Sequence, residues 1–92
     1  KLMQNFNEKL QENFPEVWEE GLLTADGFED AFVGVGRQFT KPVAVYDREK
    51  CIEVLVARDG MSMEEAEEYF EYNVQGAYVG EDTPIFMERF PD

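Results

Sequence analysis

Residues 43–60, VAVYDREKCIEVLVARDG, hold the clearest structural signals in the chain. The first four, 43–46, are mostly β-branched or aromatic, which is typical of a strand. Asp47 follows at a helix-cap position, where its carboxylate can accept hydrogen bonds from the free amides of a first turn. Gly60 suits the left-handed residue that ends a helix. The apolar residues between them recur at helical spacing: Cys51, Ile52, Leu55 and Val56. The stretch predicts a strand that leads directly into an amphipathic helix.

Upstream of this stretch, residues 31–36 (AFVGVG) predict another strand. Strand alternation would place three of its residues on one face: Ala31, Val33 and Val35. Phe32 and two glycines, Gly34 and Gly36, would lie on the other face. Glycines inside a strand mark a bulge or the close approach of a neighbour. We expect this strand to form a hairpin with residues 43–46, through a polar connection of medium length over 37–42.

The N-terminal part, residues 1–23, is predicted to be helical. A first helix over 2–12 follows from apolar residues at helical spacing: Leu2, Met3, Phe6 and Leu10. Pro15 suits the first position of a second, short helix, and it disfavours helix at the residue before it. Asp26-Gly27 then predicts a turn.

Downstream, Ser62 and Glu65 form a capping box, which predicts a helix over residues 63–75 that ends at Gly76. Its inward residues are expected to be Ala66, Tyr69, Phe70 and Val74. A third strand is predicted within 83–87, where Pro84 confines it to a sheet edge or a strand start.

These elements predict one α+β domain over residues 1–92, with a helical part at 1–23. Residues 28–92 would supply a β-hairpin, two helices and a final strand. We expect a small antiparallel sheet of about three strands covered by about four helices. Its core is expected to contain Trp18, Val33, Val45, Ile52, Leu55, Tyr69 and Phe70.

The charge balance is strongly acidic. Lys and Arg number 8 against 21 Asp and Glu, which gives a net charge of -13 with no histidine. Such a field repels nucleic acid and anionic membranes, and it attracts basic protein surfaces. No apolar run approaches the ~20 residues of a membrane span. A single cysteine, Cys51, cannot form an internal disulfide, so we expect a cytoplasmic protein. From the charge and the lack of a long apolar run, we expect neither a membrane nor a nucleic acid as direct partner.

Residues with catalytic or ligand-binding potential are few. The absence of histidine excludes Ser-His-Asp triads and histidine-metal sites. Cys51 lies on an apolar stripe and is expected to be structural. The glycine-rich turn at 34–37 lacks the remainder of a phosphate-binding fingerprint. Three acids near the predicted turn match no calcium loop: Asp26, Glu29 and Asp30. We therefore expect a non-enzymatic protein without metal or cofactor, although a small enzyme that uses carboxylates or a divalent cation remains an alternative.

Two stretches carry a resemblance to a known family. They are TADGFEDAFVGVG, at 24–36, and VYDREKCIEVLVARDGMSMEEAEEYFEYNVQGAYVGEDTPIF, at 45–86. Over roughly residues 22–86 the chain resembles small uncharacterised proteins encoded by tailed bacteriophages and prophages. The resemblance implies a phage or prophage origin and expression in a bacterial cytoplasm. It assigns no functional residues.

The candidate binding residues lie on the helix predicted over 63–75. Four glutamates would share the side opposite its inward residues: Glu64, Glu67, Glu68 and Glu71. Two of their pairs are four residues apart, and like charges at that spacing cost a few tenths of a kcal/mol each. Glutamate is also a good helix former, so an ordinary solvated face is the competing interpretation. The repulsion nevertheless favours a face that is used.

The sequence thus supports two main functions. The first is an acidic protein that docks a basic surface of a host or phage protein, as a mimic of DNA. The helical rise places glutamates one turn apart at about 6 Å, comparable to the separation of phosphates along a strand. The second is a structural or assembly accessory protein, compatible with a homodimer, in which the acidity is incidental.

Overall fold

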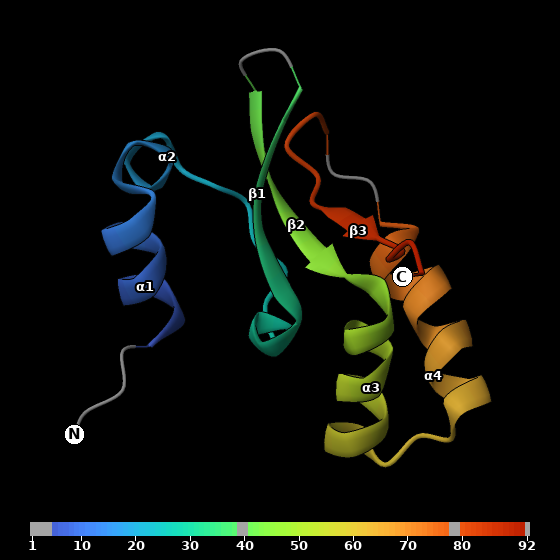
Figure 1. The fold of residues 1–92 in the computed structure, drawn as a ribbon. Helices are drawn as coiled ribbons and strands as arrows, with labels where there is room; N and C mark the ends of the chain where they lie inside the picture. The colour runs from blue at the N-terminus through green and yellow to red at the C-terminus, as the bar shows by residue number, and fades with distance from the viewer. Residues whose placement is uncertain (1–4, 39–40, 78–79, 92) are drawn as a thin grey trace.

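The computed structural model describes residues 5–38, 41–77 and 80–91. Figure 1 shows the arrangement of the helices and strands. In chain order they are α1 (Phe6–Asn13), α2 (Pro15–Glu20), a 3₁₀ turn η1 (Glu29–Ala31), β1 (Phe32–Gln38), β2 (Lys41–Asp47), α3 (Arg48–Asp59), α4 (Met63–Phe70), a π-helical segment η2 (Glu71–Gln75) and β3 (Ile85–Met87). The α+β class is confirmed, with four α-helices and three strands in the described residues.

The three strands form one sheet in the order β1-β2-β3. β1 and β2 are antiparallel, as expected of a hairpin, but β3 pairs with β2 in parallel. The prediction of a wholly antiparallel sheet was therefore wrong, and the sheet is mixed. The reason is the connection: the chain leaves β2 into α3 and α4 and returns beside β2 in the same direction. Such a crossover between parallel strands is commonly made by helices.

The local signals around β2 and α3 are confirmed. The Asp47 carboxylate accepts a hydrogen bond from the Lys50 amide at 3.2 Å, and Gly60 ends α3 in the left-handed region at φ 70°. A Cβ at Gly36 would lie 2.9 Å from a Val45 methyl, so glycine there allows a close approach. The strands pair as far as Gln38 and Lys41, so the predicted connection over 37–42 was too long.

The core is centred on Tyr46, which is fully buried in β2. Its hydroxyl accepts a hydrogen bond from the Ala25 amide at 2.8 Å, so burial leaves this polar atom satisfied. The buried cluster around it comprises Phe28, Ala31, Ala44, Cys51, Ile52, Leu55, Ala66 and Phe70. Three predicted core residues belong to this cluster and are confirmed: Ile52, Leu55 and Phe70.

Two predicted core residues are exposed instead. Val33 is 50% exposed because β1 has a bulge: Phe32 pairs with Tyr46 and Gly34 with Val45, which leaves Val33 as the extra residue. Tyr69 is 43% exposed. The buried residues of α4 are Ala66 and Phe70, which lie one above the other on the helix, and Tyr69 lies to one side of them. The other two predicted core residues, Trp18 and Val45, are partly buried.

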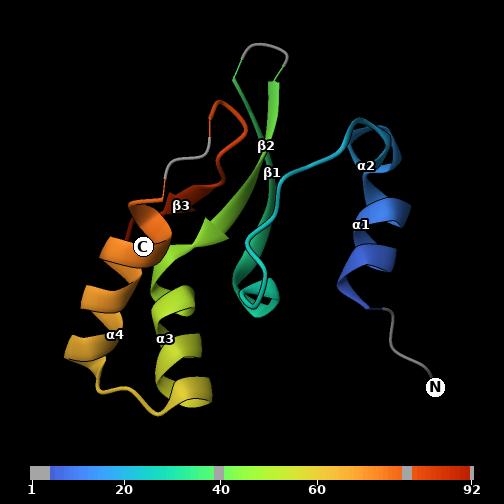
Figure 2. The ribbon, with the colours of Figure 1, turned by 180° about the vertical axis from the view of Figure 1, so that it is seen from behind.

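A row of aromatic rings joins the N-terminal helices to the rest of the molecule. Phe6 on α1 packs edge-on against Phe32 on β1, with 4.9 Å between centroids, and Phe32 packs in turn against Tyr46 at 5.4 Å. Phe86 on β3 continues the row to Phe70 on α4, at 5.1 Å. Figure 2 shows from behind that α1 and α2 lie beyond β1, on the side away from α3 and α4. The helix predicted over 2–12 begins at Phe6 in the described residues; positions 2–4 lie outside them.

Candidate functional site

Helix α4 is fixed at its start by the predicted capping box. The Ser62 hydroxyl accepts from the Glu65 amide at 3.1 Å, and the Glu65 carboxylate accepts from the Ser62 amide at 2.9 Å. Ala66 and Phe70 are fully buried on its inner line. These anchors determine which side of α4 faces solvent.

The four predicted binding residues do lie on that solvent side. Each of them is exposed, and helical spacing groups them within about a third of the helix circumference: Glu64, Glu67, Glu68 and Glu71. We call this group the acidic face. The structure departs from the predicted helix over 63–75 in one respect. The regular α-helix α4 ends at Phe70, and Glu71 begins the π-helical segment η2.

One member of the acidic face is neutralised within the molecule. Arg48, at the start of α3, donates to the Glu71 carboxylate at 2.9 Å and to the Gln75 side chain at 3.1 Å. Its guanidinium also lies over the Phe70 ring, 5.7 Å from the centroid. Helical spacing indicated only the repulsion within the helix and did not predict this ion pair. Arg48 lies 23 positions from Glu71 in the sequence, so local spacing could not reveal the contact.

The other three glutamates have no such partner. Across the described ranges, none of Glu64, Glu67 and Glu68 forms an ion pair, and the four salt bridges there join other residues. Glu64 and Glu68 remain a like-charged pair one turn apart. The uncompensated part of the acidic face is thus these three carboxylates.

Asp47 is the one buried acid among the described residues, 5% exposed. Burial opposes its ionisation, but hydrogen bonds from Arg89 and from the Lys50 amide outweigh that effect and lower its pKa below the ordinary value. The distance from the Arg89 guanidinium to the carboxylate is 3.0 Å. The Asp47 carboxylate caps α3 and bonds to Arg89 in the segment after β3, so its role is structural.

Cys51 is fully buried on the inner side of α3. Burial raises the pKa of its thiol to about 12, and the nearby Asp47 charge adds to the effect. A reactive cysteine needs a thiolate near neutral pH, which this environment disfavours. The structural interpretation of Cys51 is supported.

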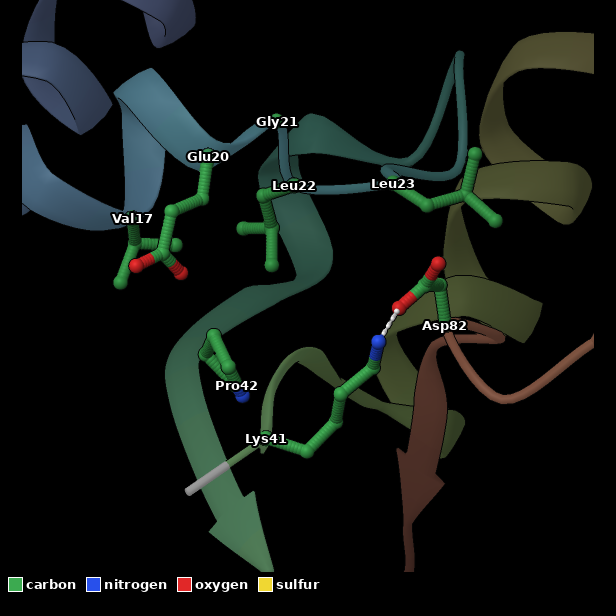
Figure 3. A pocket seen from close by; sticks show the side chains of 8 residues that line it. All are labelled: Val17, Glu20, Gly21, Leu22, Leu23, Lys41, Pro42 and Asp82. Atoms are coloured by element: carbon green, nitrogen blue, oxygen red, sulfur yellow. Dashed lines mark ion pairs between the residues drawn. The ribbon is translucent and has the colours of Figure 1, made fainter.

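A pocket of about 230 Å³ lies between α2, β2 and the segment before β3. Figure 3 shows Lys41 and Asp82 pointing toward each other across it, 2.7 Å apart, with Glu20 nearby on α2. The hydrogen bond that Lys41 donates to the Asp82 carboxylate raises the pKa of Lys41. A lysine held protonated serves poorly as a nucleophile or base, so the pair is suited to bridging elements rather than to catalysis.

The remaining candidate ligand-binding residues are engaged structurally. Glu29 accepts a hydrogen bond from the Gly27 amide at 3.1 Å, and Asp26 and Gly27 form the predicted turn. In the part of the chain that the structure describes, no three histidine, cysteine or acidic side chains are grouped to hold a metal ion. Gly34 and Gly36 lie within a strand and are not followed by a helix. None of the helices in the described part of the protein combines the length and apolarity needed to span a membrane.

Comparisons with known proteins give no relative for this chain: no family model, no curated protein and no solved structure matches it. The function therefore has to be inferred from the surface itself. The acidic face has a charge arrangement that the fold does not require, because three of its carboxylates form no ion pair in the described residues.

Proposed function

We propose that this protein is a non-enzymatic binding protein that docks a basic surface of another protein through Glu64, Glu67 and Glu68. Glu71 flanks them but is already bound by Arg48. One observation carries the proposal: three exposed carboxylates share one side of α4 without a cation among the described residues. A helix face selected for stability alone would gain from interleaved lysines.

The overall charge supports the same kind of partner. At a net charge of -13, the long-range field speeds encounters with cationic surfaces and disfavours nucleic acid as a direct ligand. A protein groove that binds DNA has the complementary charge. We propose that the acidic face occupies such a groove as a mimic of DNA phosphates. The resemblance to tailed-phage proteins favours a host or phage protein in a bacterial cytoplasm as the partner.

The test is a capture experiment from bacterial lysate at low salt. Wild-type protein is compared with the triple variant Glu64→Gln, Glu67→Gln, Glu68→Gln, which keeps the fold because glutamine has nearly the same helix propensity. A protein retained by the wild type should be lost from the triple variant and released by added duplex DNA. Glu71 is left unchanged so that its bond to Arg48 is preserved.

A matched control separates position from net charge. The variant Glu16→Gln, Glu19→Gln, Glu53→Gln also removes three exposed carboxylates, from α2 and α3. It should capture the same protein as the wild type. Equal losses from both variants would show that total charge, rather than the acidic face, retains the partner, and the proposal would then fail.

A second candidate function, an assembly accessory, is favoured by exposed apolar side chains. Phe90 is 89% exposed, and Ile85, on the sheet-edge strand β3, is 50% exposed. Such residues would pair copies of the chain. Light scattering after size exclusion tests this alternative: a dimer that Ile85→Lys dissociates favours assembly, and a monomer at all concentrations removes it.

A further inference from the structure

Beside the acidic face, α4 and η2 carry two exposed tyrosines along a shallow groove. Tyr69 is 43% exposed and Tyr72 is 80% exposed. Together with Glu68 they border a depression that runs to Met61, in the connection between α3 and α4. We call it the tyrosine groove. Neither ring belongs to the row of aromatic contacts through the core.

The charged groups in the tyrosine groove are not equally available. Asp59 is held by the Arg58 guanidinium at 3.1 Å, and Glu65 is occupied by the capping box. Glu68 forms no ion pair with any described residue. The groove therefore offers one uncommitted carboxylate next to two aromatic rings, which suits one monovalent cation better than a metal ion that needs several oxygens.

The molecule already binds its own arginines in this way. Arg48 lies over the Phe70 ring at 5.7 Å while donating to Glu71. Arg58 lies over Phe28, also at 5.7 Å, while donating to the neighbouring Asp59. Both combine a ring face with an adjacent carboxylate. The tyrosine groove repeats that combination on the surface; Arg58 reaches its edge at Asp59 but is not among the residues that line it.

We propose that the tyrosine groove receives an arginine side chain of the basic partner, stacked on Tyr72 and bonded to Glu68. The inference rests on the proposed function, and it adds the residue type that the partner contributes. Arginine fits better than lysine because its planar guanidinium can stack on a ring and still donate to a carboxylate in its plane. An ammonium group is more strongly hydrated and donates from a single point.

The test uses oligoarginine and oligolysine peptides of equal length, titrated at low salt. Wild-type protein should bind oligoarginine more tightly than oligolysine. Replacing Tyr72→Leu should reduce this arginine preference about two- to fivefold, the value expected for an exposed cation–π contact. Tyr72→Phe should retain the preference, since it keeps the ring. Phe90→Leu, at another exposed aromatic residue, should also leave it unchanged.

Failure of this inference is distinguishable from failure of the proposed function. The double variant Glu64→Gln, Glu67→Gln should weaken both peptides equally and preserve the arginine preference. If Tyr72→Leu leaves that preference intact, the tyrosine groove does not select arginine and the inference is overturned, although the acidic face can still bind. If the double variant binds both peptides as the wild type does, the proposed function is what fails.

Discussion

Helices α3 and α4 lie side by side, and both bury an apolar inner side against the same core, yet their outer faces differ (Figure 1). α3 carries three basic and three acidic residues: Arg48, Lys50, Arg58, Glu49, Glu53 and Asp59. The stretch from α4 through η2 carries five glutamates and no basic residue. The capping box accounts for Glu65 and the ion pair with Arg48 accounts for Glu71, which leaves three glutamates without a structural partner in the described residues.

The difference shows which charged residues of the two helices support the fold and which have no structural contact that explains them. On α3 both arginines have identifiable tasks, because Arg48 bonds to Glu71 and Arg58 donates to the Gly27 carbonyl at 2.8 Å. On α4, three glutamates make no ion pair in the described residues and two of them repel each other. The inner faces of the two helices should therefore respond alike to mutation, and the outer faces should respond differently.

The largest expected effect is on the shared core. Leu55→Ala in α3 removes a fully buried side chain and should lower the free energy of unfolding by about 2–5 kcal/mol. The control is Leu23→Ala, at a leucine that is 40% exposed, which should cost clearly less. Denaturant melts measure both. Equal losses for the two leucines would mean that the inner side of α3 is misassigned.

Next in size is the buried carboxylate at the start of α3. Asp47→Asn keeps a capping oxygen but removes the charge that bonds to Arg89, and should cost about 1–2 kcal/mol at neutral pH, since the arginine end is exposed. Folding lowers the pKa of Asp47, so this stability is present above the unfolded-state pKa and is lost as the pH falls through the folded-state pKa. The two proteins should converge in acid melts. A difference independent of pH would contradict the charge assignment.

The helix cap of α4 is expected to contribute less. Ser62→Ala removes the acceptor for the Glu65 amide and should lower the free energy of unfolding by about 0.5–2 kcal/mol. Ser62→Asp keeps an acceptor and should restore it. If alanine and aspartate leave the same melting midpoint as serine, the start of α4 does not depend on this cap.

The smallest expected effect lies on the outer face. Glu68→Lys turns the repulsive pair with Glu64 into an attractive one and should raise the free energy of unfolding by about 0.2–0.5 kcal/mol. Glu53→Lys is the control on α3, because Glu53 has one acidic neighbour at i−4, Glu49, and one basic neighbour at i−3, Lys50, so the gain and the loss should nearly cancel. A loss of stability from Glu68→Lys would show that this carboxylate supports the fold and would remove the contrast between the helices.

Local sequence signals predicted α3 and the start of α4 well. Asp47, Gly60 and Ser62 act within three or four residues of their partners, so their roles can be inferred from spacing alone. The exposure of Val33 could not be inferred, because it depends on where the extra residue of β1 falls against β2. The parallel pairing of β3 likewise depends on a connection of nearly forty positions, from Asp47 to Ile85.

The candidate site was likewise predictable only where it depends on local spacing. Helical periodicity was enough to group Glu64, Glu67, Glu68 and Glu71 on one side. It could not reveal that Arg48 neutralises Glu71, because that contact joins two helices. The exposure of Tyr69 was missed because hydrophobicity was taken as a sign of burial. Helical spacing could have indicated this exposure: Ala66 and Phe70 are four residues apart and share one side of the helix, and Tyr69 lies beside that side.

The central claim is that three uncompensated glutamates of α4 form a binding face, and the salt dependence of binding tests it most directly. The captured partner is titrated with wild type, the Glu64, Glu67, Glu68 triple glutamine variant and the matched control at increasing salt. Wild type and control should lose affinity steeply as salt screens the attraction, and the triple variant should start weaker with a shallower slope. Identical affinities and slopes for all three proteins would contradict the account and leave the acidic face of α4 as an ordinary solvated surface.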